Sequence, residues 1–354
     1  MFAIRFYRIY DIGKEVDIKS LERALKESVT ISRARFVQVK PRAIIIKHAP
    51  LLLRLDPMAV EQDGKTYTFR VDARVYDIGA ISICLIYEAF EGTPEELEET
   101  ALCFAGQRGL DTAFTTTIAR LLAVLKSAVG ERTVDEEFYE DYAIYITHSL
   151  DDSLDPTRIL LGDTTAFSAE TRNETLKNAL SYSESDRAIL TRDSAILVNT
   201  EPPSDLIELI EYANVQLLEL RFYDGELTRQ MEKMYDDIEM ADHLYFFYRI
   251  RQYRAIMMGL MQTQAEISEI TEKVNNLIKV TEDVYYGRIY AMCLKAMSCQ
   301  QWSDSVGRKI EVIRQTYAML SDEVNIQHSN YLEWVVIILI ALEVMLFVLP
   351  ITPH

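Results

Sequence analysis

The stretch Trp334–Leu349, WVVIILIALEVMLFVL, is the most apolar part of the sequence and decides how the chain is organised. Twelve of its sixteen residues are Val, Ile, Leu or Phe, and Glu343 is its one charged residue. Each of the twelve favours insertion into a bilayer by roughly 0.3–0.6 kcal/mol, whereas a central acid opposes it by about 3 kcal/mol. Insertion is favoured by about 1–4 kcal/mol, so the stretch predicts a transmembrane helix, although a span usually needs roughly 20 residues. The alternative is a helix buried in a soluble oligomer.

The residues that flank this stretch predict its orientation. Tyr331 and Trp334 stand at its entry edge as membrane-interface aromatics, and Pro350 and Pro353 end the helix on the far side. The nearest cations all precede it, namely Arg308, Lys309 and Arg314. We therefore expect a single-pass, tail-anchored membrane protein with the bulk of the chain on the cytoplasmic face. The N-terminus has no signal-peptide pattern, which agrees with this topology.

Glu343 is an ionisable residue at membrane depth, and such residues usually pair within a bundle or mark a functional position. The predicted helix offers no basic partner. Two interpretations stay open: several anchor helices associate around protonated Glu343, or a single neutral acid is tolerated in the lipid.

Composition limits the classes of partner. The 354 residues carry a net charge of −18 and are 49% apolar, which is typical of folded globular units. Residues 1–60 hold 12 Lys and Arg against 6 Asp and Glu, whereas the remainder holds 25 against 49. Because an acidic body repels phosphate backbones, we expect no direct sequence-specific binding of nucleic acid. The basic N-terminal part is the one candidate surface, and its alternative role is to neutralise the acidic remainder.

Residues 1–203 read as a mixed α/β head domain. Alternating or β-branched runs predict strands at Phe2–Tyr10, Ala43–Leu55, Thr66–Tyr76, Ala80–Phe90, Tyr139–Thr147 and, around a turn at Arg192 and Asp193, within Arg187–Asn199. Cap residues and helical periodicity predict helices after Asp17 or Ser20, after Thr93, at Leu110–Val129 and at Ser168–Leu180. The fold class is α+β.

Residues 204–333 read as a stalk of long helices, with Ser204 as the predicted N-cap. Mainly apolar residues recur at alternate steps of four and three along three seams, and Asp224 is the one polar member of the first seam. The seams are Leu206, Ile210, Ala213, Leu217, Leu220, Asp224, Leu227, Met231, Met234, Ile238 and Ala241; Ile267, Ile270, Val274, Leu277, Thr281 and Val284; and Val306, Ile310, Ile313, Tyr317, Leu320, Val324, Gln327, Tyr331 and Trp334. Sustained heptads predict coiled-coil or hairpin packing, with breaks expected at Gly259, Gly287 and Gly307. The last helix is expected to run without interruption into the membrane segment, residues 334–349.

The sequence contains no recognisable catalytic motif. The five histidines and four cysteines lack metal-ligand spacing, so we expect no metal, no cofactor and buried, reduced thiols. Two acidic groups are the one pattern suited to Mg²⁺: Asp151, Asp152 and Asp155, and Asp236, Asp237 and Asp242. A solvated acidic loop is the preferred explanation of these acids, because Pro156 places the first group in a loop.

Three stretches together resemble a known family. They are Tyr212–Asp224, YANVQLLELRFYD; Leu180–Asp186, LSYSESD; and Glu333 and Trp334 with the apolar run through Glu343. In this order they are similar to the required-for-meiotic-nuclear-division family, also catalogued as a YagE-type domain of unknown function, over about residues 70–349. The resemblance implies one C-terminal membrane helix and assembly into large homo-oligomers. Its relatives include a mitochondrial inner-membrane protein that supports translation by tethering ribosomes.

The resemblance implies no catalytic residue, but it marks polar positions for study. These candidate family-motif residues are Asn214, Gln216, Glu219, Arg221 and Asp224. They form either a buried network that sets helix register or a binding surface. We expect a membrane-anchored, non-enzymatic, homo-oligomeric scaffold or tether that links translation machinery or another protein to a membrane. The alternative is an enzyme with an unrecognised site in the α/β head, with Mg²⁺ held by the aspartate-rich segments.

Overall fold

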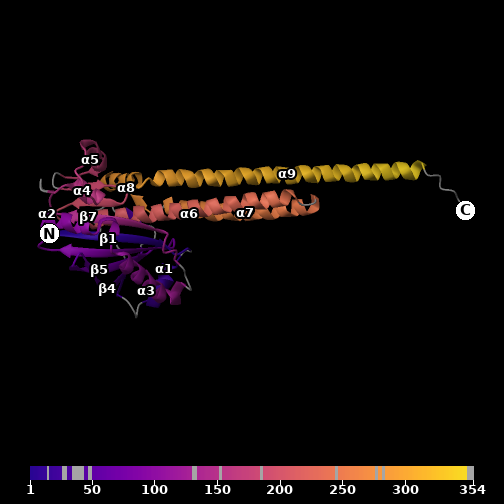
Figure 1. Cartoon of the computed structure of the whole chain (residues 1–354). Helices are drawn as coiled ribbons and strands as arrows, with labels where there is room; N and C mark the ends of the chain where they lie inside the picture. Colours follow the sequence, from indigo (N-terminus) through magenta and orange to yellow (C-terminus); the bar gives the residue numbers. More distant parts are fainter. Residues whose placement is uncertain are drawn as a thin grey trace. The chain divides into compact units, whose positions relative to one another are not determined.

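The chain is a mixed α+β protein, as predicted, in which a sheet and its helices precede long helices (Figure 1). The computed structural model describes residues 1–13, 16–25, 30–33, 44–46, 50–129, 134–150, 154–183, 186–243, 246–275, 278–280 and 284–348. The residues divide into two compact units. The first comprises Met1–Phe222 and Thr271–Ser303, and the second comprises Tyr223–Ile270 and Asp304–His354.

A nine-stranded sheet organises the first unit, in the order β2-β4-β5-β6-β1-β7-β10-β9-β8. Its strands are β1 (Phe2–Asp11), β2 (Thr30–Arg33), β4 (Leu51–Gln62), β5 (Lys65–Val75), β6 (Ala80–Ala89), β7 (Tyr139–Thr147), β8 (Ala179–Leu180), β9 (Arg187–Leu190) and β10 (Ser194–Val198). A second, two-stranded sheet pairs β3 (Ile44–Ile46) with β11 (Ile278–Val280). The predicted strands Phe2–Tyr10, Thr66–Tyr76, Ala80–Phe90 and Tyr139–Thr147 are confirmed to within one residue at each end.

The N-terminal strand β1 lies at the centre of the sheet. It pairs antiparallel with β6 on one side and with β7 on the other, so that Phe6 lies opposite both Leu85 and Ala143. The pairing of β7 with β10 is parallel, with Ala143 opposite Ser194. The turn predicted at residues 192 and 193 joins β9 to β10. Parallel pairing therefore brings this turn next to the start of β7.

Nine α-helices and one short 3₁₀ turn lie within the described residues. The helices are α1 (Ile18–Leu25), α2 (Pro94–Cys103), α3 (Asp111–Val129), α4 (Pro156–Leu161), α5 (Ala169–Leu176), α6 (Ser204–Asp242), α7 (Phe246–Asn275), α8 (Val284–Ala296) and α9 (Cys299–Val348). The 3₁₀ turn is η1 (Ala105–Gln107).

Local capping explains where several of these helices begin. The Thr93 hydroxyl accepts from the Glu96 N–H while the Glu96 carboxylate accepts from the Thr93 N–H, which is a capping box at the start of α2. Asp17 accepts from the N–H groups of Lys19 and Ser20 and so caps α1. One predicted helix was too long: α5 ends at Leu176, because residues 179–180 pair with β9 as β8.

One face of the sheet carries the main apolar core. Odd residues of β5 and even residues of β1 point to this face, where they pack with α2, α3 and α4. Phe69 is fully buried there, with its ring centroid 5.6 Å from that of Phe104 and 6.3 Å from that of Phe6. The alternation predicted for Tyr67, Phe69, Val71 and Ala73 is therefore confirmed.

The opposite face of the sheet combines buried apolar side chains, such as Ile9, Ile144 and Leu197, with charged ones. Even residues of β5 and odd residues of β1 point there, and contacts from Arg74 and Tyr76 to the first half of α6 show that this helix covers them. Cys84, Cys293 and Cys299 are buried free thiols, as expected, whereas Cys103 is half-buried.

The second unit is built from helical segments whose seam positions are buried. Buried positions include Leu227, Met234 and Ala241 on α6, and Val306, Ile313, Leu320, Val324 and Gln327 on α9. Asp224, the polar member of the first seam, accepts from Ser305 Oγ at 2.6 Å and pairs with Lys309 Nζ at 2.8 Å. The Asp224 carboxylate, which lies in the apolar seam, is therefore paired with polar side chains of α9.

The predicted glycine breaks are wrong. Gly259, Gly287 and Gly307 lie within α7, α8 and α9 respectively. A helical glycine costs only about 1 kcal/mol relative to alanine, which tertiary packing readily offsets. The described helices instead end at Asp242 (α6), Asn275 (α7) and Ala296 (α8).

The last helix, α9, runs without interruption from Cys299 to Val348, as predicted. Its seam is buried as far as Gln327, but the apolar side chains beyond that point are not. From Tyr331 to Met345 the exposed large apolar residues have 41% to 64% of their surface accessible. Within this second unit, the apolar end of α9 therefore has no protein covering.

Candidate functional site

Two of the predicted family-motif residues on α6 make buried hydrogen bonds within the first unit. Asn214 donates through Nδ2 to the carbonyl of Ile210, one turn earlier on the same helix, at 2.9 Å. The Gln216 side chain accepts through Oε1 from the Tyr290 hydroxyl of α8 at 2.6 Å. Both side chains are nearly inaccessible, so a partner does not reach either one from solvent.

Glu219 is the most deeply buried of the motif residues, with 1% of its surface exposed. Burial raises the pKa of its carboxyl well above the ordinary value, and the charges of Asp11 and Asp77 raise it further. Its Oε1 makes no hydrogen bond with any described residue. Glu219 therefore lies within the protein interior, where its environment favours the neutral form of the carboxyl.

The boundary between the two units falls within α6, so that Arg221 belongs to the first unit and Asp224 to the second. Arg221 forms an ion pair with Glu140 of β7 and lies 5.4 Å from the Phe138 ring centroid and 5.8 Å from that of Trp302. Asp224 belongs to the second unit and is held by Ser305 and Lys309. The structure gives the motif residues separate partners, and the role predicted for them stays a prediction.

A buried charged cluster beneath α6 was not found by sequence reasoning. Arg74 of β5 forms ion pairs with Glu208, at 3.2 Å, and with Glu211. All three side chains have less than a sixth of their surface exposed. Arg74 and Glu211 are 137 residues apart in sequence, so no local spacing could have indicated their contact. The one available signal was the row of charged residues Arg70, Asp72 and Arg74 at alternate positions of a strand-like segment.

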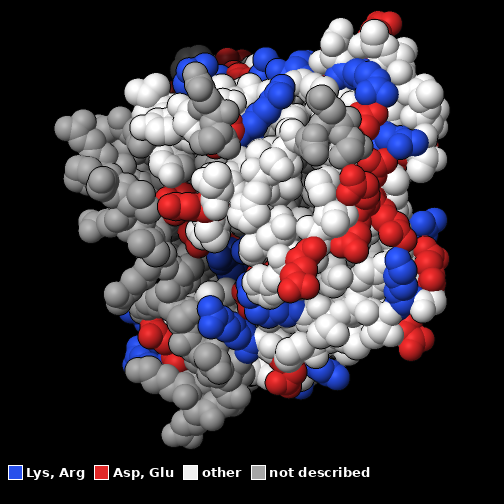
Figure 2. Space-filling model, turned by 90° about the vertical axis from the view of Figure 1, so that its left-hand side faces the viewer, with Lys and Arg blue, Asp and Glu red and all other residues white. Residues whose placement is uncertain are grey.

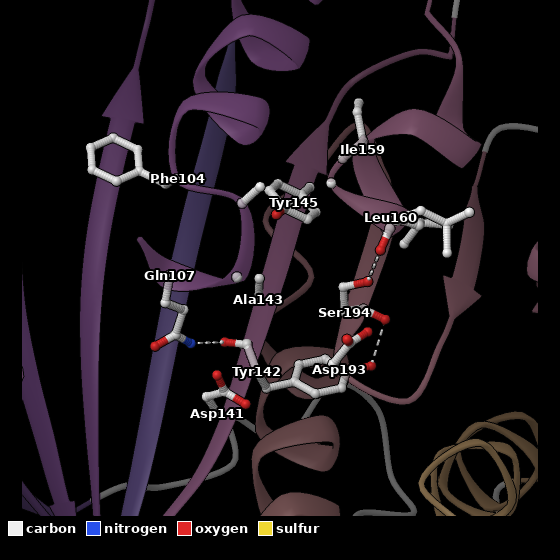
Figure 3. Close-up of a pocket in the computed structure, with 14 residues that line it drawn as sticks. Phe104, Gln107, Asp141, Tyr142, Ala143, Tyr145, Ile159, Leu160, Asp193 and Ser194 are labelled. Atoms are coloured by element: carbon white, nitrogen blue, oxygen red, sulfur yellow. Dashed lines mark hydrogen bonds between the residues drawn. The ribbon is translucent and has the colours of Figure 1, made fainter. Parts of the chain in front are cut away.

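A cavity of about 160 Å³ lies on the apolar face of the sheet, between η1, α4 and the start of β7. Asp141, Ala143 and Tyr145 enter it from alternate positions of β7 (Figure 3). Asp193 enters from the β9–β10 turn, and Ser194 is the first residue of β10. The remaining lining residues are Phe104, Ala105, Gly106, Gln107, Tyr142, Ile159, Leu160, Leu161 and Gly162. The cavity is smaller than the roughly 300–1,000 Å³ of most small-molecule sites, and both polar and apolar residues line it.

Hydrogen bonds fix the walls of this cavity. The Gln107 amide donates through Nε2 to the Tyr7 carbonyl at 2.8 Å, and the Tyr142 hydroxyl donates to the Ser194 carbonyl at 2.8 Å. The Ser194 hydroxyl donates to the Leu160 carbonyl at 3.0 Å. At Gly162, which has a φ of +63°, a Cβ would come within 2.8 Å of Ala105 Cβ. Glycine at this position therefore lets α4 end directly against η1.

The predicted aspartate-rich Mg²⁺ site gains no support from Asp155. Its carboxylate accepts from the Thr157 N–H at 3.0 Å as the cap of α4, and it pairs with Arg172 at 2.8 Å. Asp151 and Asp152 lie outside the described residues, as does the side chain of Asp242. Among the side chains that the structure describes, no group of three or more His, Cys, Asp or Glu could hold a metal ion.

The C-terminal part of α9 is the one described helix that is long and apolar enough to cross a membrane. None of its most apolar 18-residue window is buried. Tyr331 and Trp334, the predicted interface residues, are both exposed, and Glu343 is exposed in the middle of the apolar stretch. Leu349, Pro350 and Pro353 lie outside the described residues.

Acidic and basic side chains are intermixed on the face of the molecule shown in Figure 2, where a row of acidic side chains lies near basic ones. A mixed surface does not concentrate positive potential. This face therefore does not favour binding to a phosphate backbone.

Comparison with known proteins places the chain in a family. It is similar to "Uncharacterized protein MJ0711" from Methanocaldococcus jannaschii, with 24% identity over 220 residues, which is 60% of this chain and 66% of the relative. The chain thus matches just under two thirds of that relative's length. No solved structure matches it significantly. Residues 1–204, more than half of the sequence, match the family described as "Uncharacterized protein MJ0711, N-terminal domain", and the chain belongs to that family.

Proposed function

We propose that the chain is a membrane-anchored, non-enzymatic scaffold or tether that self-associates. The observation that carries this proposal is the exposed apolar end of α9: its large side chains stay uncovered around the helix, although the same helix buries its seam up to Gln327. Exposing so much contiguous apolar surface to water is unfavourable, and lipid is the environment that removes the penalty. The single continuous helix would transmit this anchorage directly to the second unit.

The position of the anchor also supports an orientation. Lys309 and Arg314 precede the apolar segment, whereas the described residues after Trp334 include no cation. An excess of cations on one flank favours the cytoplasmic side for that flank. The scaffold would therefore present its α+β unit and its helices to the cytoplasm.

A partner for this scaffold is suggested by the resemblance of residues 70–349 to the required-for-meiotic-nuclear-division family. Under that resemblance the cytoplasmic part would contact the translation machinery or another protein. The matched region of the MJ0711 family ends at residue 204, so it includes the sheet but leaves out nearly all of the long helices.

Membrane attachment is tested with matched charge substitutions on α9. The variant L339R/L342R places two cations in the apolar segment, which opposes insertion by about 3 kcal/mol each. The control M319R/I326R places two cations at equally exposed positions of the same helix outside that segment. We expect wild type and control to remain in the carbonate-resistant membrane pellet and L339R/L342R to be released. Wild-type protein in the supernatant of a detergent-free lysate would contradict the proposal.

Self-association is tested at Glu343. If several anchor helices associate around this acid, E343L lowers the mass of the detergent-solubilised particle measured by native mass spectrometry. E333L is the matched control, because Glu333 is exposed one helical step before the apolar segment. An unchanged mass for E343L would exclude Glu343 as the contact.

A second candidate function is an enzyme with its site in the α+β unit. The observation that favours it is the preformed cavity between η1, α4 and β7. Purified protein that is monomeric and carries a tightly bound small cofactor would support the enzyme and contradict the scaffold.

A further inference from the structure

The second half of α6 and the first half of α9 run in the same direction within the second unit. The Ser305 hydroxyl donates to the Asp224 carboxylate at 2.6 Å, and Lys309 Nζ donates to the Thr228 hydroxyl at 2.6 Å. In each contact the two residues are 81 positions apart in the sequence. Because every α-helical residue advances the chain by about 1.5 Å, an equal separation at both contacts means that the two helices are parallel.

Burial along the two helices agrees with this alignment. The separation of 81 positions places Asp242, the last residue of α6, level with Glu323 of α9. Among the described side chains, Ala241 is the last buried one on α6, and Gln327 is the last buried one on α9. Helix α9 therefore loses its protein covering close to the level at which α6 ends.

The chain turns back after α6. Helix α7 begins at Phe246, and Figure 1 shows it returning along α6. Tyr253, Ile256 and Leu260 are buried, so α7 packs within the same unit. The end of α6 and the start of α7, residues 240–243 and 246–251, form what we call the hairpin end. It lies about level with residues 323–327 of α9.

The hairpin end is close to the level at which the exposed apolar part of α9 begins. Tyr331 follows Gln327 by four residues, which is about 6 Å along the helix. A bilayer of about 40–45 Å has a hydrocarbon core of about 30 Å, which leaves a headgroup layer of roughly 5–8 Å on each side. When α9 enters the bilayer near Tyr331, the hairpin end is therefore at the depth of the headgroup layer.

The described side chains of the hairpin end suit that layer. Tyr248 has 67% of its surface exposed and Met240 has 59%, and His243 and Arg251 are also exposed. In the sequence, residues 243–248 read HLYFFY, so most of them are Tyr or Phe. Tyrosine is enriched where a protein meets the headgroup layer, because its ring is apolar while its hydroxyl stays in contact with water.

Exposed acids limit the kind of lipid that this surface attracts. Asp236 and Glu239 are exposed on α6 just before the hairpin end, and they offset the charges of the exposed Arg251 and Arg254 on α7. A surface of mixed charge does not concentrate the positive potential that draws a protein to anionic lipid. A contact here therefore depends on aromatic side chains and neutral headgroups.

We propose that the hairpin end is a second membrane contact, which lies in the headgroup layer of a zwitterionic bilayer with Tyr248 at the lipid surface. The proposal rests on the proposed anchorage of α9, and the contact is continuous with that anchor. A single membrane helix tilts by about 20° on average. A second contact beside the anchor limits this tilt and so fixes the orientation of the second unit at the membrane.

The test uses full-length protein in phosphatidylcholine vesicles that contain a lipid with a nitroxide quencher on its headgroup. The native tryptophans are Trp302 and Trp334, so W334F leaves Trp302 as the background. W334F/Y248W reports on the hairpin end. W334F/Y235W is the matched control, because Tyr235 is also an exposed tyrosine, and the same alignment places it about 22 Å before Tyr331.

We expect the headgroup quencher to lower the fluorescence of Trp334 in wild type and that of the tryptophan in W334F/Y248W to a similar extent. The tryptophan of W334F/Y235W should be quenched no more than the Trp302 background. If Trp334 is quenched but the two double variants behave alike, the hairpin contact is wrong and the α9 anchor stands; a hairpin end covered by a second copy of the chain gives this result. If Trp334 itself is not quenched, the anchor is wrong and the hairpin contact is wrong with it.

Discussion

The two faces of the nine-stranded sheet are built from alternate residues of the same strands, yet they are stabilised in different ways. On one face Phe69 and its neighbours pack rings against Phe104 and Phe6. On the other face, Arg74 is buried against α6 and forms ion pairs with Glu208 and Glu211. An antiparallel sheet often leaves its polar face in water. Here the first half of α6 covers Arg74, so its charge must be paired inside the protein.

This difference predicts how each face tolerates change. The stability of the apolar face depends on close packing, because neighbouring side chains cannot fill the cavity that is left when a buried ring is truncated. The charged face depends on pairing, because an uncompensated buried charge is strongly unfavourable. Three experiments separate the two kinds of stabilisation.

The largest effect is expected on the apolar face. F69A removes a fully buried ring and should lower the free energy of unfolding by about 3–5 kcal/mol, measured by chemical denaturation in detergent. F90A is the control, because Phe90 is 70% exposed just beyond the end of β6, and its change should stay within about 0.5 kcal/mol. Equal losses in the two variants would mean that this face is not the close-packed core.

An intermediate effect, which depends on pH, is expected on the charged face. Burial raises the pKa of Glu208 from its ordinary value of 4.5 to about 7; Arg74 opposes this rise and Glu211 adds to it. Between these values the folded chain keeps a proton that the unfolded chain has released, so stability falls as the pH rises from 4.5 to 7, by up to about 3 kcal/mol.

E208Q does not titrate at this position, so its unfolding midpoint should fall less than that of wild type over the same pH range. E232Q is the control, since Glu232 is exposed on the same helix. A variant whose pH profile is superimposable on that of wild type would show that Glu208 does not account for the slope.

The smallest effect concerns single hydroxyl groups. Tyr76 Oη is buried and makes no hydrogen bond with any described residue, although its ring lies 5.3 Å from that of Tyr212. Y76F should therefore stabilise the protein by about 1 kcal/mol. Y142F should destabilise it by a similar amount, because the Tyr142 hydroxyl donates to Ser194. If the thermal midpoints of Y76F and Y142F moved in the same direction, the hydrogen bond of the Tyr142 hydroxyl would not explain the difference expected between the two variants.

Several elements could be predicted because their determinants are local. The capping box at Thr93 and the alternation of Thr66–Tyr76 depend on residues within a few positions of one another. The glycine breaks and the length of α5 were predicted wrongly for the opposite reason. A single glycine costs a helix only about 1 kcal/mol, which is too little to break the long helices at Gly259, Gly287 and Gly307. Pairing with β9 drew residues 179–180 into the sheet.

The sequence predicted individual elements that line the candidate cavity, but not that these elements would come together. The strand Tyr139–Thr147 and the turn at Arg192 and Asp193 were both expected from the sequence. Nothing local indicated that β10 would pair in parallel with β7 and so bring Asp193 to the same space as Asp141. The two residues are distant along the chain, and their proximity depends on sheet order.

The sequence by itself determined the apolar end of α9, the heptad seams, the start of α6 and the α+β class, because periodicity, capping and hydropathy are properties of neighbouring residues. The tertiary structure alone decided which charges share the interface beneath α6 and which carboxylates face the cavity. Those contacts form when the order of strands, set by the packing of the whole unit, joins residues far apart in the chain.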